Sequence, residues 1–170
     1  TQGVSSAASD VYKRQTAIQA NDLVGRKTAR DGGQNAKAIA AQIEKTEAEL
    51  AKSDSAAAKA VLKRLKAARE AFVEVVDFVA GQTKASPNAV FAGSVPYLML
   101  AGNLVAGWQL ARSLIVAQDQ ASHNVDVDFM QAKITTARFY AEHILAKAPG
   151  LRDSIVDGAE SVNALALEAY

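Results

Sequence analysis

Residues 88–117 read NAVFAGSVPYLMLAGNLVAGWQLARSLIVA, and Arg112 is the first charged residue among them. Apolar or small side chains fall on every side of a helical wheel drawn through this segment, not along one stripe. A helix that is apolar all round is buried, either inside a bundle or inside a membrane. We therefore predict that this segment is the central helix of a water-soluble bundle, on which every other helix of the chain packs.

A membrane-spanning helix is the alternative interpretation, because the uncharged run over residues 88–111 is long enough to cross a bilayer. Pro96, Asn103 and Gln109 interrupt that run. The flanking segments lack the one-sided excess of Lys and Arg that sets the orientation of a membrane helix. The neighbouring segments are amphipathic and need an apolar partner. We therefore predict no membrane span, with a membrane-associated bundle as the weaker hypothesis.

Two features of the central segment predict its local geometry. Pro96 should bend the helix or mark its first turns, because proline lacks an N–H and its ring clashes with the carbonyl four residues back. Ala101, Gly102, Ala106 and Gly107 should let a neighbouring backbone approach closely.

The composition of the chain excludes several classes of protein. With 170 residues, 49% of them hydrophobic and 22% charged, the chain is neither disordered nor fibrous. A formal charge of +1 gives no argument for nucleic acid as a partner. The lack of cysteine excludes disulfides, a thiol nucleophile and a thiolate metal site. It fits a reducing compartment, and with no signal-peptide pattern at the start we predict a cytoplasmic protein.

The rest of the chain shows helical periodicity and no convincing strand. Apolar residues three and four positions apart form one stripe in residues 55–81 (Val61, Leu65, Ala68, Phe72, Val75 and Val79) and another in residues 128–146 (Met130, Ile134, Ala137, Ala141 and Ile144). In residues 34–52, Glu47 is among the polar residues that lie off the apolar stripe. Short connections make sequential helices antiparallel neighbours. The sequence therefore predicts an all-α fold, an antiparallel bundle of five to six helices around the central apolar helix. The other helices are expected over residues 16–30, 34–52, 55–81 and 128–146, with Pro149-Gly150 ending the last of these, and in a short segment from residue 151.

Glycine and cap residues mark the predicted helix ends. Gly32 and Gly33 can take the positive φ that ends a helix, and the Asp31 side chain can cap the next one. Ser86 is the expected cap of the central helix, and Pro87 its first residue.

Residues 1–15, TQGVSSAASDVYKRQ, differ from everything that follows, because they are rich in Ser and Ala and lack apolar periodicity. The run DVYKRQ resembles a translated transposon end of the kind used to fragment DNA for sequencing. We expect a non-native, poorly packed tail and keep it out of the fold prediction. A flexible natural tail is the alternative.

No group of residues predicts a self-sufficient active site. His123 falls in a loop, and His143 has no metal-binding partner three or four residues away on its helix. Residues 102–107 lack the Lys of a phosphate-binding loop. Tyr97 and Trp108 are expected in the core, not as a stacking platform.

Two blocks carry a resemblance to a known family. The first is TAIQANDLVGRK over residues 16–27, followed by Asp31-Gly32-Gly33; the second is DFMQAKITTARFYAEHIL over residues 128–145, with Gly107-Trp108 upstream. The chain resembles the C-terminal part of the acyl-CoA dehydrogenase family. More narrowly, it resembles the branch with an added C-terminal helical domain, which includes members acting on 3-methylmercaptopropionyl-CoA.

The resemblance implies an FAD-dependent reaction, but the catalytic residue for that reaction is missing from this chain. In the family, a Glu in a Tyr-Glu-Gly-Thr stretch removes the α-proton of the acyl thioester while FAD takes the β-hydride. Here Lys13, Arg14 and Gln15 stand where Glu-Gly-Thr is expected, and a Lys is cationic near neutral pH. No catalytic residue is therefore expected. The family's loop here runs near the flavin, which makes Thr16 and Gln19 the candidate cofactor contacts.

The resulting hypothesis is a C-terminal fragment of an FAD-dependent acyl-CoA dehydrogenase. Residues 16–33 would be the last helix of the catalytic bundle and 34–170 an accessory helical domain. The full-length enzyme from which the fragment derives is called the parent. The fragment would pack on the rest of the dehydrogenase body, and the parent would form a homo-oligomer and bind an acyl-CoA substrate. Alone, the chain should be inactive and should not retain FAD. The alternative is an independent helical protein-interaction module.

Overall fold

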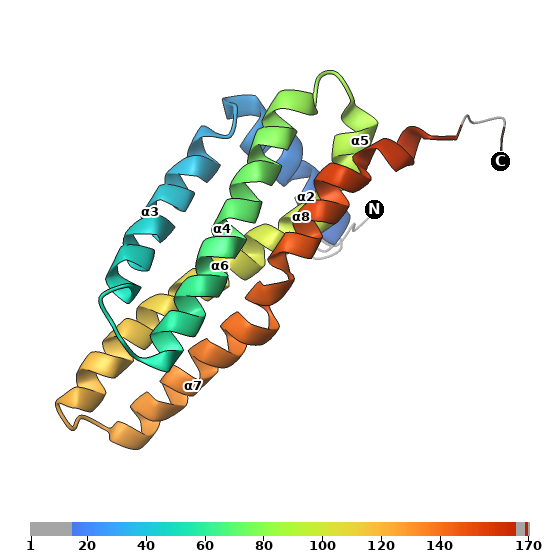
Figure 1. Cartoon of the computed structure of the whole chain (residues 1–170). Coiled ribbons are helices and arrows are strands. Elements are labelled where there is room, and N and C mark those ends of the chain that lie inside the picture. The colour runs from blue at the N-terminus through green and yellow to red at the C-terminus, as the bar shows by residue number, and fades with distance from the viewer. Residues whose placement is uncertain (1–14, 166–168, 170) are drawn as a thin grey trace, which may run out of the picture.

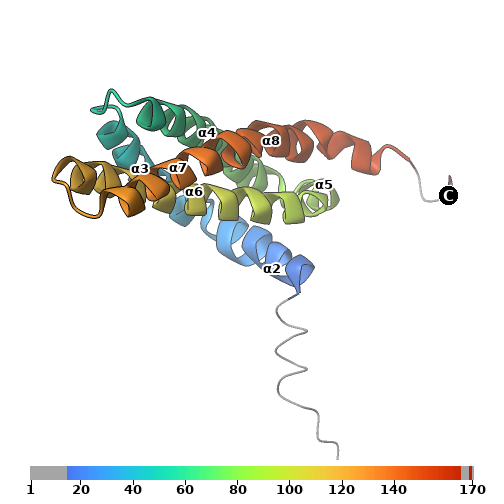
Figure 2. The same cartoon turned by 90° about the horizontal axis from the view of Figure 1, so that it is seen from below.

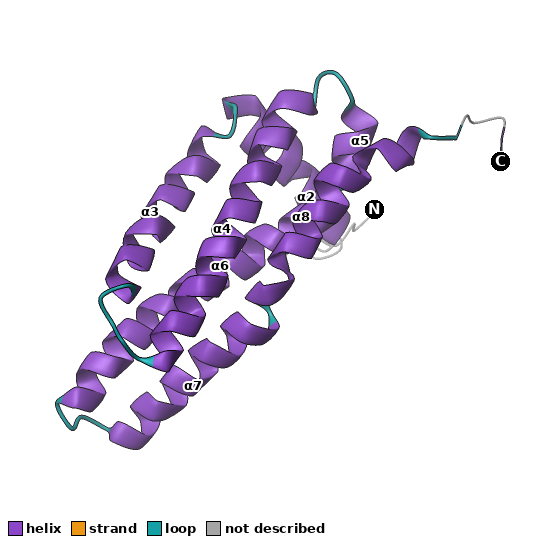
Figure 3. Cartoon of the chain, viewed as in Figure 1, coloured by secondary structure: helices purple, strands orange, loops and turns teal. Residues whose placement is uncertain are grey.

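The computed structural model describes residues 15–165 and 169, and this part of the chain is helical with no strand (Figure 3). The predicted all-α class is confirmed. The elements are α2 (Thr16–Asp22), η1 (Leu23–Thr28), η2 (Ala29–Asp31), α3 (Gln34–Leu50), α4 (Ala56–Gln82), α5 (Pro87–Ala92), α6 (Ser94–Ser122), α7 (Val127–His143), η3 (Leu145–Lys147), α8 (Ala148–Val156) and η4 (Asp157–Asn163).

The long helices α3, α4, α6 and α7 lie side by side, each antiparallel to the one before it (Figure 1). Helix α8 follows α7 and packs on α4 and α6. Helix α6 contacts α2, α3, α4, α5, α7 and α8, which confirms its predicted central place. The bundle is therefore built around the pair α4 and α6.

Helix α4 shows the amphipathic stripe that its sequence predicts. Its start is fixed by Ser55, whose Oγ accepts a hydrogen bond of 3.0 Å from the Ala58 backbone N–H. The predicted apolar positions are all buried, and they are Val61, Leu65, Ala68, Phe72, Val75 and Val79. Because apolar residues three and four apart share one face of a helix, this stripe faces the core.

The central segment is broken into α5 and α6 at Gly93, so the prediction of one helix over residues 88–117 is wrong at this point. Pro96 lies in the first turn of α6, as expected, where its missing N–H costs no helical bond. At Gly93, a Cβ would lie 2.9 Å from the Cγ2 atom of Ile155 on α8. Ser86 stands at the N-cap of α5 but its side chain makes no capping hydrogen bond, while Pro87 begins the helix as predicted.

One side of α6 is open to solvent, which contradicts the expectation that it is buried all round. Its inner face is fully buried, and Leu98 and Trp108 are partly covered. The outer face leaves Val95 38%, Met99 51%, Val105 40% and Val116 58% exposed. Figure 2 shows α2 and the segment that follows it on the side of α6 that faces away from α4 and α8.

Helix α7 buries the predicted stripe through Ala137 and Ala141 but leaves Phe129 and Phe139 exposed. It ends at His143, earlier than expected. Pro149 does not end that helix as predicted, because it lies in the first turn of α8, where proline is tolerated.

The segment over residues 16–30 is helical as predicted but changes form along its length. Helix α2 passes into the π-helical turn η1, in which the Ala29 N–H bonds to the carbonyl of Val24, and then into a 3-10 turn. Gly32 (φ 66°) and Gly33 (φ 80°) confirm the predicted positive-φ ending. The Asp31 carboxylate accepts hydrogen bonds from the Gly33 N–H at 2.9 Å and the Asn35 N–H at 3.1 Å, which confirms its capping role.

Candidate functional site

The two predicted cofactor contacts lie together on the first turn of α2. Thr16 begins the helix, and Gln19, one turn later, donates its backbone N–H to the carbonyl of Gln15 at 3.1 Å. Residues three apart share a helix face, and both side chains are exposed. A hydroxyl and an amide on one exposed turn can contact the edge of a flavin but cannot enclose FAD. The residues present therefore do not fit the whole cofactor.

A buried pair of hydroxyls ties this N-terminal segment to the bundle. Thr28 Oγ1 and Tyr97 Oη lie 2.8 Å apart, and the two residues are 1% and 0% exposed. Burial raises the pKa of the Tyr97 phenol. The Tyr97 ring stacks on Phe72, with the ring centroids 6.0 Å apart. Tyr97 is thus a core residue, as predicted, whereas nothing in the local sequence singled out Thr28.

A second polar cluster joins α3 to α4 and α6. Arg69 Nε and Nη2 donate to the two Glu47 carboxylate oxygens at 2.7 Å and 2.9 Å, and Trp108 Nε1 donates to Thr46 Oγ1 at 2.8 Å. The hydrogen bond to Glu47 raises the pKa of Arg69. Glu47, predicted to lie off the apolar stripe of its helix, is only 6% exposed, because the Arg69 guanidinium binds it across the helix interface. Every member is satisfied by another member, so the cluster is structural.

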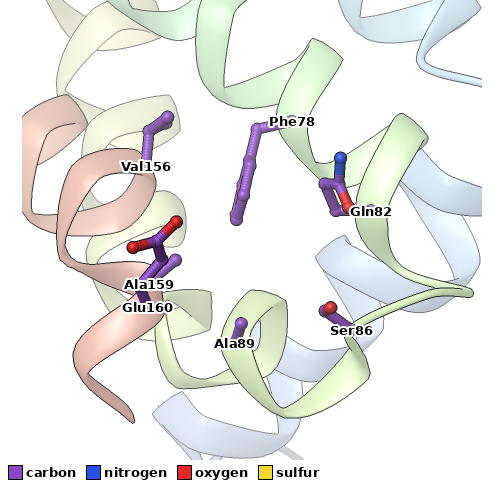
Figure 4. A pocket seen from close by; sticks show the side chains of 7 residues that line it. All are labelled: Phe78, Gln82, Ser86, Ala89, Val156, Ala159 and Glu160. Carbon is purple, nitrogen blue, oxygen red and sulfur yellow. The ribbon is translucent and has the colours of Figure 1, made fainter. Parts of the chain in front are cut away.

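A cavity of about 430 Å³ opens at the end of the bundle where α4, α5, α8 and η4 meet (Figure 4). Phe78, Val156 and Ala159 supply apolar walls. Gln82 and Ser86 lie on one side of it and Glu160 on the other (Figure 4). The lining offers a carboxylate, an amide and a hydroxyl, without a histidine or lysine to act as a base beside a nucleophile.

The histidines lie on different elements in exposed settings. His123 Nδ1 is 2.8 Å from the Asp119 carbonyl oxygen, and the His143 ring packs against Phe139 with the centroids 4.4 Å apart. Over residues 15–165, no three His, Cys, Asp or Glu side chains gather into a set that could hold a metal ion.

None of the described helices combines the length and hydropathy that crossing a bilayer requires.

The fold and these polar groups define a helical domain whose hydrogen-bond networks hold helices together. Residues 37–166 match the family described as acetyl-CoA dehydrogenase C-terminal like, and the chain belongs to this family. The predicted resemblance to the C-terminal part of the acyl-CoA dehydrogenase family is confirmed, and the matched range includes the block at residues 128–145.

Curated relatives agree with the family match. The chain is 43% identical over 152 residues to 3-methylmercaptopropionyl-CoA dehydrogenase of Ruegeria pomeroyi, covering 89% of this chain and 26% of the relative. It is 29% identical over 161 residues to broad-specificity linear acyl-CoA dehydrogenase FadE5 of Mycobacterium tuberculosis, covering 85% of this chain and 25% of the relative. The chain therefore spans about a quarter of the length of the curated relatives that it matches.

Proposed function

We propose that this chain is the C-terminal helical domain of an FAD-dependent acyl-CoA dehydrogenase and is catalytically inactive by itself. The observation that carries the proposal is the family match over residues 37–166 together with 43% identity to a quarter of a relative named as such a dehydrogenase. The parent would oxidise the α,β bond of an acyl-CoA thioester, with FAD accepting the hydride. Its specificity and oligomeric assembly would reside largely in the remaining three quarters of the polypeptide.

The side chains present here support the proposal that catalysis and flavin retention depend on the rest of the parent. Lys13, which lies outside the described residues, stands where the resemblance places the catalytic Glu, and a cationic Lys cannot remove an α-proton. Thr16 and Gln19 are proposed to contact the flavin from one side in the parent. Without further residues that enclose the cofactor, these two side chains would not retain FAD.

In this proposal residues 16–33 are the last helix of the catalytic bundle and residues 34–170 the accessory domain. The Thr28–Tyr97 hydrogen bond would hold the two parts in a fixed relation, because it is buried and joins η1 to α6. A cytoplasmic location is also proposed, and the cysteine-free composition of this chain fits a reducing compartment.

An activity assay tests the proposal. The purified chain is incubated with FAD, desalted and examined for flavin absorbance, then assayed with a medium-chain acyl-CoA and an electron acceptor. The Ruegeria pomeroyi relative serves as the positive control. We expect neither retained flavin nor turnover from this chain, and turnover above the no-protein rate would overturn the proposal.

An independent interaction module is the second candidate, and the exposed apolar side chains of α6 and α7 favour it. A module would bind its partner in the absence of any dehydrogenase body. The accessory domain would instead be found only as part of a longer flavoprotein.

A further inference from the structure

The outer face of α6 is an exposed surface without charge. We define the outer α6 face as Val95, Met99, Gly102, Val105, Ala106 and Val116, all exposed and all within about 120° of the helix circumference. The exposed, uncharged Gln109 lies in the same arc. It is about 32 Å long at a rise of 1.5 Å per residue. Between Ser94 and Gln118 the only charged residue is Arg112, whose guanidinium lies over the Trp108 ring, 5.7 Å from its centroid.

The exposed surface of α3 has a different composition. The solvent side of α3 carries Lys37, Glu44, Lys45 and Glu49, as a solvated helix face normally does. Exposed apolar side chains scattered singly are ordinary, but a contiguous stripe of them marks an interaction surface. The outer α6 face is such a stripe.

Two glycines on α6 differ in what lies next to them, one inside the molecule and one on its surface. A Cβ on Gly107 would lie 2.6 Å from Leu145 Cδ1, so this glycine is explained by the close approach of η3 inside the molecule. A Cβ on Gly102 would meet nothing within 4 Å. Glycine inside a helix costs about 0.5–1 kcal/mol relative to alanine, and nothing packed inside this chain compensates for that cost at Gly102. A close neighbour from outside the chain would.

A groove of about 290 Å³ opens beside the Met99 end of this face. Its lining comes from α6, η3 and α8 and is mostly apolar, and consists of Met99, Asn103, Ile144, Lys147 and Leu151. A surface that combines small residues with an adjacent apolar groove can receive the side chains of a second helix.

We propose that the outer α6 face is buried against the dehydrogenase body of the parent enzyme. This inference rests on the proposed function. In the curated relatives about three quarters of the polypeptide lies outside the matched part. Helix α2, proposed as the last helix of the catalytic bundle, already packs on α6 next to this face (Figure 2). Its neighbours in that bundle would therefore lie over the rest of the face.

The occupant is an apolar, helical surface belonging to the same polypeptide. The Thr28–Tyr97 hydrogen bond fixes α2 on α6, so the bundle that contains α2 has a restricted orientation relative to the face. A second copy of the chain and a lipid surface are the competing occupants, and each gives a different result in the test.

Met99 supplies a direct readout, since it is half exposed on the face and Met130 is the only other methionine. Residues 16–170 are grafted onto the Ruegeria pomeroyi relative in place of its matching quarter. Peroxide oxidation of Met99 is followed by peptide mass spectrometry in the isolated chain and in the flavin-bound chimera. We expect Met99 to oxidise at least about tenfold more slowly in the chimera, since oxidation follows exposure, while Met130 on α7 changes little.

Equal oxidation rates of Met99 in a chimera that binds flavin and turns over substrate would overturn this inference and leave the proposed function intact. Turnover by the isolated chain would instead overturn the proposed function. Protection of Met99 in the isolated chain that grows with protein concentration would assign the face to a second copy. Protection only with phosphatidylcholine–phosphatidylglycerol vesicles would assign it to lipid. Either result contradicts the inference.

A matched pair of variants gives an independent measurement. Ala106→Glu places a charge on the outer α6 face, and Ala41→Glu places the same charge on the exposed side of α3, between Lys37 and Lys45. As isolated chains, both variants should unfold at the same temperature as the unsubstituted chain. In the chimera, only Ala106→Glu should reduce the yield of flavin-bound enzyme and restore Met99 oxidation. Equal behaviour of the two variants there would contradict the docking surface.

If no chimera retains flavin, hydroxyl-radical footprinting of the intact Ruegeria pomeroyi enzyme replaces it. The side chains aligned with Val95, Met99 and Val105 should be protected in that enzyme and labelled in this chain. Equal labelling in the two proteins would overturn the inference.

Discussion

The hydroxyl oxygens of Thr28 and Tyr97 lie 2.8 Å apart in the core, although the two residues are 69 positions apart in the chain. Each hydroxyl is the partner of the other in a place that water does not reach, because both residues are essentially unexposed. A buried polar group without a hydrogen bond is costly, so this pair favours one position of η1 on α6.

Replacing Thr28 with valine should therefore destabilise the chain by about 1–3 kcal/mol, because the Tyr97 hydroxyl stays buried without its partner. Thr28→Ser keeps the hydroxyl and should recover most of that loss. The free energy of unfolding in urea measures both. If valine and serine at this position were equally stable, the hydrogen bond would contribute nothing.

The stability of the chain should fall in alkaline solution through Tyr97. Burial raises the pKa of this phenol in the folded state above its ordinary value of about 10. The stability linked to it is complete below the unfolded pKa and is lost as pH rises from about 10 through the folded pKa. Lysines titrate in the same range, so the unsubstituted chain is compared with the Tyr97→Phe variant. The stability of the variant should fall less steeply between pH 9 and 11. Parallel pH profiles would refute this assignment.

The Glu47–Arg69 pair should be far more important for stability than the neighbouring Glu44. Glu47→Ala leaves the partly buried Arg69 guanidinium without its bidentate partner, which should cost about 3 kcal/mol. Glu44 is exposed and 3.9 Å from Arg69, so Glu44→Ala should change stability by at most about 0.5 kcal/mol. Urea unfolding of the two variants distinguishes them, and similar losses would count against a buried pair.

Alanine at the two α6 glycines should have opposite effects. Gly102→Ala should stabilise the isolated chain by about 0.5–1 kcal/mol, because the new methyl group enters open space and helix propensity improves. Gly107→Ala should destabilise it by about 1–2 kcal/mol net, because Leu145 is buried and must move away. Thermal unfolding gives both shifts. A stabilising effect of Gly107→Ala would contradict this prediction and would mean that Leu145 moves away at little cost.

Local patterns predicted the helices and several of their ends. The spacing of Val61, Leu65 and Phe72 identified the buried side of α4, and the Asp31 cap and the two glycines after it lie where the sequence placed them. These features depend on residues within one or two turns of each other, which a sequence displays directly.

Contacts between distant segments were not predictable in this way. The break at Gly93 lies where α8 approaches through Ile155, and the burial of Glu47 depends on Arg69 from another helix. The exposure of Met99 and Val116 could not be foreseen either, because a helix face that awaits an external partner has the same composition as one buried inside.

The candidate site was predictable only through resemblance. Thr16 and Gln19 share an exposed turn of α2, and their assignment as flavin contacts stays a prediction, as does the domain boundary after residue 33. The segment expected to be a non-native tail, residues 1–15, lies outside the described residues except for Gln15, which is exposed.

The most direct measurement of the central claim is the DNA sequence of the source genome upstream of the codon for Thr16. The account predicts an open reading frame that runs in frame through a Tyr-Glu-Gly-Thr stretch from a dehydrogenase body. A start codon immediately upstream of Thr16, with no such stretch in frame before it, would contradict the account and favour an independent helical module.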